Sequence, residues 1–407
     1  MSKFRRPTSH VLLSVAAIAM AAFAGLPANA QMSAQMVFEA QNALPMPAKS
    51  GQFDRLAPRT AVKRAKLDYS IWDDALENVV LDFGPSTRRR ARRPDASVGT
   101  RFVRGHKSAY RLEGSRVTFS YLNDAYRQAL SEYRKDLQAI ATQVDITKFS
   151  RDEQLAFWFN LHNVALIEQI AKAYPIDRPA NIKIRVNGER TPLDEAKFIS
   201  VKGVNLSLRD IREKVVYANW SDSNVIYGFF RGNIGSPKLP RIAYTSDEVQ
   251  DMLKANATEF VNSLRGFHEA SQTRNVSVVY EEAKPFYFRN WDADLTAHLL
   301  THAERETVAE VQSGKRFKTD KYDSIIADLS AGNRLASSGN QIKGAGTMSF
   351  DTMRLLSEVE EKQRVLRRKG IENPNQRRGF VIIEDMAADE TSIIAAPPQI
   401  ITDDAGN

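Results

Sequence analysis

Apolar residues cover nearly every face of a helical stretch at residues 150–174, and this is the clearest pattern in the chain. Ser150 and Glu153 are spaced as a capping box, which predicts that a helix begins here. Pro175 ends the pattern. A helix that is apolar all round belongs in the centre of a globular core. Its apolar positions are Leu155, Phe157, Trp158, Phe159, Leu161, Val164, Leu166, Ile167 and Ile170.

Further helical and strand-like patterns flank this segment. Short apolar runs predict strands at 225–230, 239–244 and 276–280. Apolar positions at helical spacing predict helices at 67–80, 119–141, 208–217, 246–266 and 291–311. Together they predict an α+β fold, a single helix-rich domain with a small sheet at residues 66–335. An amphipathic C-terminal helix at 350–369 is expected outside it.

The two ends of the chain have a different character. Residues 1–30 combine three early cations, an apolar run and small residues at Ala28 and Ala30, which is typical of a signal peptide cleaved after Ala30. Residues 31–65 are predicted to be a flexible N-terminal segment, and 336–407 a linker, the amphipathic helix and a flexible acidic tail. We therefore expect export to the periplasm, with no transmembrane segment after cleavage.

Composition narrows the possible chemistry. The 407 residues are 43% hydrophobic, which is enough for a substantial core. The chain contains no cysteine, so it has neither disulfides nor a thiolate nucleophile. Its formal charge of +8 falls to +5 when the three cations of residues 1–30 are removed. This mild positive balance does not by itself indicate nucleic acid.

A block of arginines between turn residues is the strongest charge feature. It suits a docking patch for an anionic envelope surface, or alternatively a solvated, mobile insertion loop. No aromatic stacking pattern accompanies it, so no nucleic-acid partner is expected. The block consists of Arg88, Arg89, Arg90, Arg92 and Arg93.

Several segments resemble the domain of unknown function 547 family. The strongest resemblance is at residues 144–163, which end in the sequence FWFNLHN. Weaker similarity occurs in LSLRDI at 206–211, in GSPKL at 235–239 and at Tyr322-Asp323. The resemblance covers about residues 66–335, and it implies the family's fold.

The chain departs from the family where a Cys/His pair is usual. Typical members have a histidine at the start of the strand that enters the loop, a cysteine at its end and another cysteine before the proline. The aligned positions here hold Ile226, Arg231 and Ser236. The resemblance therefore implies that any chemistry based on that pair has been lost.

The polar residues of the motif are the candidates for a binding cleft. They are Asn160, His162, Asn163, Tyr227 and Ser236. Ser236 is also the candidate nucleophile of an envelope hydrolase or acyl transferase, provided that a base lies beside its hydroxyl. Otherwise it is a loop serine that hydrogen-bonds its own turn.

The remaining histidines give weaker signals. His298 and His302 are four residues apart on a predicted helix, which suits either a metal site or two surface histidines. His106 and His268 stand alone in the sequence. No phosphate loop or dinucleotide fingerprint occurs, so no cofactor is expected.

These observations favour a non-catalytic binding or scaffold module of the cell envelope, with an unidentified envelope protein or polymer as partner. The alternatives are the Ser236 enzyme and a metal-dependent activity at His298 and His302.

Overall fold

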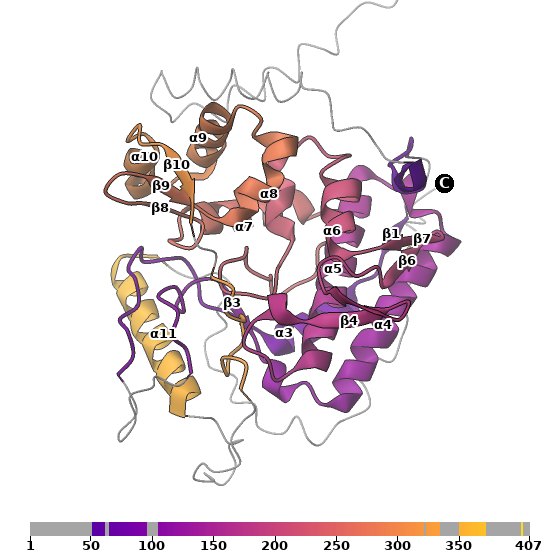
Figure 1. Cartoon of the computed structure of the whole chain (residues 1–407), viewed down its shortest axis with the longest axis horizontal. Coiled ribbons are helices and arrows are strands. Elements are labelled where there is room, and N and C mark those ends of the chain that lie inside the picture. The colour runs from indigo at the N-terminus through magenta and orange to yellow at the C-terminus, as the bar shows by residue number, and fades with distance from the viewer. Residues whose placement is uncertain are drawn as a thin grey trace, which may run out of the picture.

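The computed structural model describes residues 51–61, 65–95, 105–320, 323–333, 350–371 and 400–401. The proposed signal peptide, the linker at 336–347 and almost all of the acidic tail lie outside these residues. The architecture is α+β and helix-rich, as predicted (Figure 1). Among the described residues, no helix is long and apolar enough to cross a bilayer.

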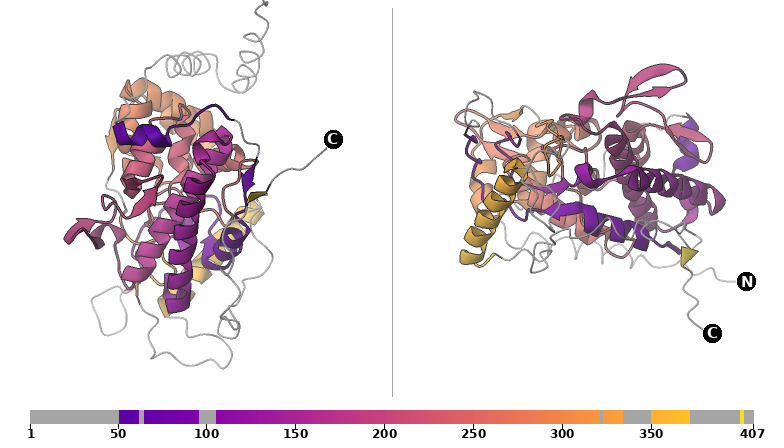
Figure 2. Two further views of the ribbon diagram at one scale, coloured as in Figure 1. Left: turned by 90° about the vertical axis from the view of Figure 1, so that its right-hand side faces the viewer. Right: turned by 90° about the horizontal axis from the view of Figure 1, so that it is seen from below.

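Helix α5 (Arg151–Ala173) is the centre of the fold, and its neighbours surround it (Figure 2). Short 3-10 turns connect several of the helices, and a π-helix continues α6. The helices are α3 (Ser70–Val79), α4 (Asp124–Gln143), α6 (Leu208–Asp210), α7 (Val249–Val261), α8 (Val278–Tyr287), α9 (Trp291–His302), α10 (Arg305–Val311) and α11 (Phe350–Arg368).

The sheets are small, with two or three strands each. The largest has the order β8–β9–β10, with β8 antiparallel and β10 parallel to the central strand. The β4–β5 hairpin projects from the body (Figure 2). The three-stranded sheet contains β8 (Phe267–Glu269), β9 (Arg274–Val276) and β10 (Phe317–Thr319). The other strands form antiparallel pairs: β1 (Lys66–Leu67) with β11 (Ile400–Ile401), β2 (Val80–Asp82) with β3 (Ser115–Val117), β4 (Lys183–Val186) with β5 (Glu189–Pro192), and β6 (Ile199–Val201) with β7 (Val204–Leu206).

The predicted start of α5 is confirmed, but only half of the capping box forms. The Ser150 hydroxyl accepts a hydrogen bond from the backbone N–H of Glu153 at 3.1 Å. The Glu153 carboxylate turns away and accepts from the N–H of Leu67 at 3.1 Å and the hydroxyl of Tyr69 at 3.4 Å. Glu153 therefore connects α5 to β1 rather than closing its own first turn.

Two of the predicted strands do not form. Residues 223–228 form a buried 3-10 helix, and 239–244 are irregular. Apolar character alone does not separate a short buried strand from another buried segment. The chain passes so close to α5 at Gly228 that a Cβ there would lie 2.4 Å from the Phe159 ring. This packing, rather than a strand ladder, decides the local conformation.

Other element boundaries also differ from prediction. The strand expected at 276–280 ends at Val276, because the Ser277 hydroxyl caps α8 by accepting from the Val279 N–H at 3.3 Å. The helix expected at 291–311 is two helices, α9 and α10, which are separated at Ala303 and Glu304. The predicted helix at 119–141 begins later, at Asp124, where the Asn123 side chain accepts from the Tyr126 N–H.

Part of the N-terminal segment that was predicted to be flexible is packed. Residues 51–56 form a 3-10 helix, and its Phe53 and Leu56 side chains are buried in the main core. Two apolar side chains therefore extend the core into the segment 31–65.

The C-terminal helix α11 packs on the domain through its own small apolar cluster. Leu355 and Val359 contact Phe83 and Leu329 there. Beside this cluster, the buried Lys362 ammonium donates to the carbonyl oxygens of Phe83 at 2.9 Å, Gly84 at 3.2 Å and Leu112 at 2.7 Å. One lysine thus satisfies three backbone acceptors that helix α11 shields from water.

We predict that Lys362→Gln lowers the free energy of unfolding by about 1–3 kcal/mol, because buried carbonyl groups lose their charged donor. Arg364→Gln is the matched control, since Arg364 also lies on α11 but has a half-exposed side chain. Urea unfolding of both variants tests this. Equal stabilities of the two variants would contradict the structural role of Lys362.

Candidate functional site

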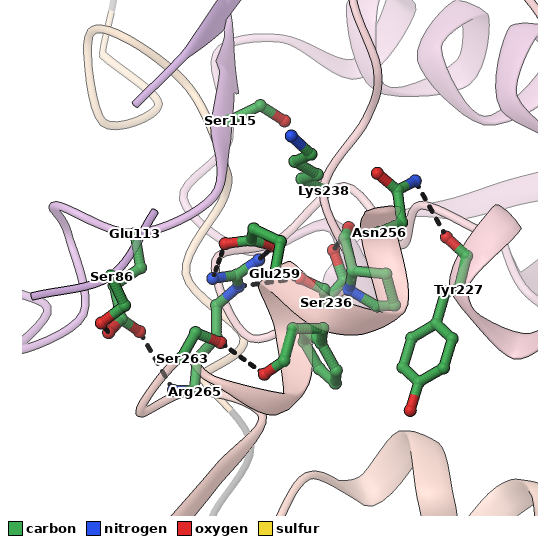
Figure 3. Close-up of polar contacts among 12 residues, drawn as sticks. Ser86, Glu113, Ser115, Tyr227, Ser236, Lys238, Asn256, Glu259, Ser263 and Arg265 are labelled. Carbon is green, nitrogen blue, oxygen red and sulfur yellow. Dashed lines mark hydrogen bonds and ion pairs between the residues drawn. The ribbon is translucent and has the colours of Figure 1, made fainter. Parts of the chain in front are cut away.

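The loop around Ser236 is closed and internally hydrogen-bonded. The Ser236 side chain is 2% exposed, and its hydroxyl lies 2.8 Å from the carbonyl oxygen of Asn233 and 3.1 Å from that of Pro237 (Figure 3). A serine nucleophile needs a base that accepts its proton. Here the hydroxyl donates to backbone carbonyl groups, which are not bases.

A buried ion pair holds this loop against α7. The Arg265 guanidinium donates to both carboxylate oxygens of Glu259, at 2.8 and 2.5 Å, and its Nε donates to the carbonyl of Ser236 at 3.2 Å (Figure 3). The Glu113 carboxylate accepts from the N–H groups of Leu264 and Arg265, each at 3.0 Å. The loop is therefore fixed by buried, charge-assisted hydrogen bonds.

The two asparagines of α5 each bind the backbone of a neighbouring segment. The Asn160 amide donates to the carbonyl of Tyr244 at 2.7 Å and accepts from its N–H at 3.0 Å. The Asn163 amide donates to the carbonyl of Gly228 at 3.1 Å and accepts from the N–H of Phe230 at 3.2 Å. Through these hydrogen bonds, the two asparagines hold the backbone in place at residues 228–230 and at residue 244.

His162 is fully buried next to these asparagines. Its Nδ1 lies 3.1 Å from the Asn163 Oδ1, and its Nε2 lies 3.3 Å from a guanidinium nitrogen of Arg212. Burial, together with the charges of Arg212 and Arg231, holds the pKa of His162 well below its usual value. The ring is therefore neutral, and its hydrogen bonds go to residues other than Ser236.

The positions of the family's usual histidine and first cysteine also have structural partners. Ile226 is buried in the main core. The Arg231 guanidinium forms an ion pair with Glu282 at 2.6 Å.

Tyr227 and the two helix histidines form a buried aromatic cluster. The Tyr227 hydroxyl lies 2.7 Å from the His298 Nε2, and the Ser223 hydroxyl lies 2.9 Å from the other ring nitrogen. The His302 Nε2 lies 2.7 Å from the Asn224 Oδ1. The expectation of two surface histidines was wrong, since both rings are about 6% exposed. In the described part of the chain, no three metal-ligating side chains are grouped to hold an ion.

The arginine block is anchored at two of its five residues. Arg88 forms an ion pair with Glu310 at 2.6 Å and also donates to the carbonyl of Asn262 at 3.2 Å. A guanidinium nitrogen of Arg90 lies 3.2 Å from the His268 Nε2. Arg89, Arg90, Arg92 and Arg93 are exposed. The block is therefore a surface segment in which Arg88 and Arg90 have partners, and Arg89, Arg92 and Arg93 are three further exposed cations.

A small polar pocket opens beside the Ser236 loop, and no local pattern of residues predicts it. Its walls include Tyr110, His268, Asn275, Asp320 and Asp323, which come from distant parts of the chain. It has room for about one water molecule. His268, which stands alone in the sequence, here shares a pocket with two carboxylates and a tyrosine.

The geometry defines a helix-rich α+β domain with a closed serine loop and a small polar pocket at its edge. Residues 146–261 match the family model described as "Protein of unknown function, DUF547", and this part of the chain is a DUF547 domain. The match includes α5, the Ser236 loop and α7. No curated protein and no solved structure matched the chain.

We predict that Asn163→Ala lowers the free energy of unfolding by about 2–4 kcal/mol, because it leaves a buried carbonyl and a buried N–H without partners. Asn205→Ala is the control, because Asn205 is exposed on β7. Urea unfolding measures both. If Asn163→Ala lowered the free energy of unfolding by less than about 1 kcal/mol, its role in holding the backbone at residues 228–230 would be contradicted.

We also predict that stability falls as the pH drops from about 6.5 to 4. Burial lowers the pKa of His106 and His302 to about 4, whereas histidines of the unfolded chain bind protons near pH 6.5. Each such histidine lowers the free energy of unfolding by up to about 1.4 kcal/mol for every pH unit of acidification in this window. Asp328 has the opposite effect below pH 6. Burial raises its pKa to about 6, so on acidification the folded state takes up this proton before the unfolded chain does, which stabilises the fold.

Urea unfolding of the wild type and His302→Gln at several pH values tests this dependence. The variant should lose stability less steeply on acidification, because one uncharged histidine has been removed. Parallel curves for the two proteins would be the contrary result.

Proposed function

We propose that this protein is an exported, non-catalytic binding module of the cell envelope. The observation that carries the proposal is the Ser236 hydroxyl, which hydrogen-bonds to the carbonyls of Asn233 and Pro237 and has no base as its partner. The family's usual Cys/His pair is absent, and the side chains that replace it are packed or paired.

The pocket beside the Ser236 loop is the proposed binding site. It combines hydrogen-bonding and charged side chains with an aromatic ring, which is the kind of lining that orients a ligand. The loop that forms one wall of it is held by the Arg265–Glu259 pair, so the pocket is preorganised.

The proposed location rests on the N-terminal sequence. Residues 1–30 have the charged, apolar and small-residue regions of a signal peptide, with cleavage proposed after Ala30. Three exposed cations, Arg89, Arg92 and Arg93, support contact with an anionic envelope surface.

A fluorophosphonate probe followed by peptide mass spectrometry tests the lack of catalysis. We expect no adduct on Ser236 under conditions that fully label an active serine hydrolase, because its hydroxyl is buried and is not activated. Ser236→Ala provides the blank. An adduct at this position in the wild type would instead support the hydrolase or acyl-transferase alternative.

A further inference from the structure

The protein's own Arg90 lies beside the polar pocket, against two of the residues that line it. Its guanidinium carbon lies 6.0 Å from the centroid of the Tyr110 ring, at the usual limit for a cation–π contact. One guanidinium nitrogen lies 3.2 Å from the His268 Nε2. Tyr110 and His268 both line the pocket, so a guanidinium group already lies against its walls.

The walls are suited to a planar cation that donates hydrogen bonds. The Nδ1 of His268 lies 3.0 Å from the carbonyl oxygen of Leu264, so Nδ1 carries the proton and Nε2 is the acceptor. A carboxylate oxygen of Asp320 lies 3.5 Å from the same Nε2. The Asn275 amide nitrogen lies 3.4 Å from Nε2 as well, and a guanidinium fork, which has five N–H groups, can offer donors to both the ring nitrogen and the carboxylate.

The second carboxylate of the pocket adds to its negative potential. Asp323 is held in place by hydrogen bonds from the Ser108 hydroxyl and from the Ile325 N–H. Together with Asp320, it places two negative charges in the lining. The Arg265 guanidinium also lines the pocket, but its charge is paired with Glu259, so the balance of charge in the lining favours a cation over phosphate or a carboxylate ligand.

We propose that the pocket wall formed by Tyr110 and His268 recognises the guanidinium group of a ligand in the place that Arg90 now takes, and that the ligand displaces Arg90 from it. This inference rests on the proposed binding function, for which it names the chemical class of ligand. Because Arg90 competes in the same molecule, the wild-type protein binds an added guanidinium only in the fraction of molecules in which Arg90 has moved away from Tyr110 and His268. Removing Arg90 therefore increases the apparent affinity.

Calorimetric titration of the full chain with N-acetyl-argininamide tests the proposal. We expect Arg90→Ala to bind the probe at least about tenfold more tightly than the wild type, because the competitor is gone. Arg92→Ala is the matched control, since it removes one exposed positive charge from the same block. It should bind like the wild type.

A second variant tests the walls of the pocket. Asp320→Asn in the Arg90→Ala background should weaken probe binding by about tenfold, because a charged acceptor becomes a neutral amide. Its thermal unfolding is measured alongside to show that the protein is folded. Equal affinities of Arg90→Ala and Arg92→Ala, or no effect of Asp320→Asn in the folded protein, would overturn the proposal.

The source of the guanidinium is decided by comparing probes on Arg90→Ala. Agmatine represents a free small molecule, and a Gly-Arg-Gly peptide with blocked ends represents an arginine side chain of a protein. Preferential binding of either one supports the guanidinium site and identifies its source. The serine labelling and these titrations are independent measurements. An adduct on Ser236 would contradict the non-catalytic assignment, whereas failure of the titrations would contradict only the ligand class.

Discussion

The burial of α5 on all of its faces is the constraint on which the rest of the structure depends. The polar side chains in the middle of the helix are buried, so their hydrogen-bond partners must come from the chain that surrounds it. Asn160 and Asn163 find theirs in the backbone at Tyr244, Gly228 and Phe230. Two asparagines on one helix thus hold two loops that have no strand ladder of their own.

The same constraint governs the charges around the helix. Glu168 is fully buried on α5, and the Arg134 guanidinium of α4 donates to both of its carboxylate oxygens, at 2.5 and 3.3 Å. Arg212 binds both carboxylate oxygens of Asp194 at 2.7 Å. The attraction within such pairs is largely offset by the loss of hydration. We therefore assign them to fixing how the elements are aligned, more than to net stability.

This packing also limits where a ligand can bind. The residues of the family-like motif are used internally, and the Ser236 hydroxyl is turned onto its own loop. The pocket forms outside this tightly packed centre, where the segment before β3 meets the segments that follow α7 and β10. In this chain, the motif supports the fold, and the proposed binding pocket lies at its edge.

The sequence by itself determined the helix-rich class, the position of α5 and the resemblance to the DUF547 family, because a helix that is apolar all round has one stable place in the domain. It did not determine the segments at 225–230 and 239–244. Their apolar residues only specify burial, and their conformation depends on the hydrogen bonds from α5. The pocket was also decided by the tertiary structure alone. Tyr110, His268 and Asp320 are far apart along the chain, and only packing brings them together.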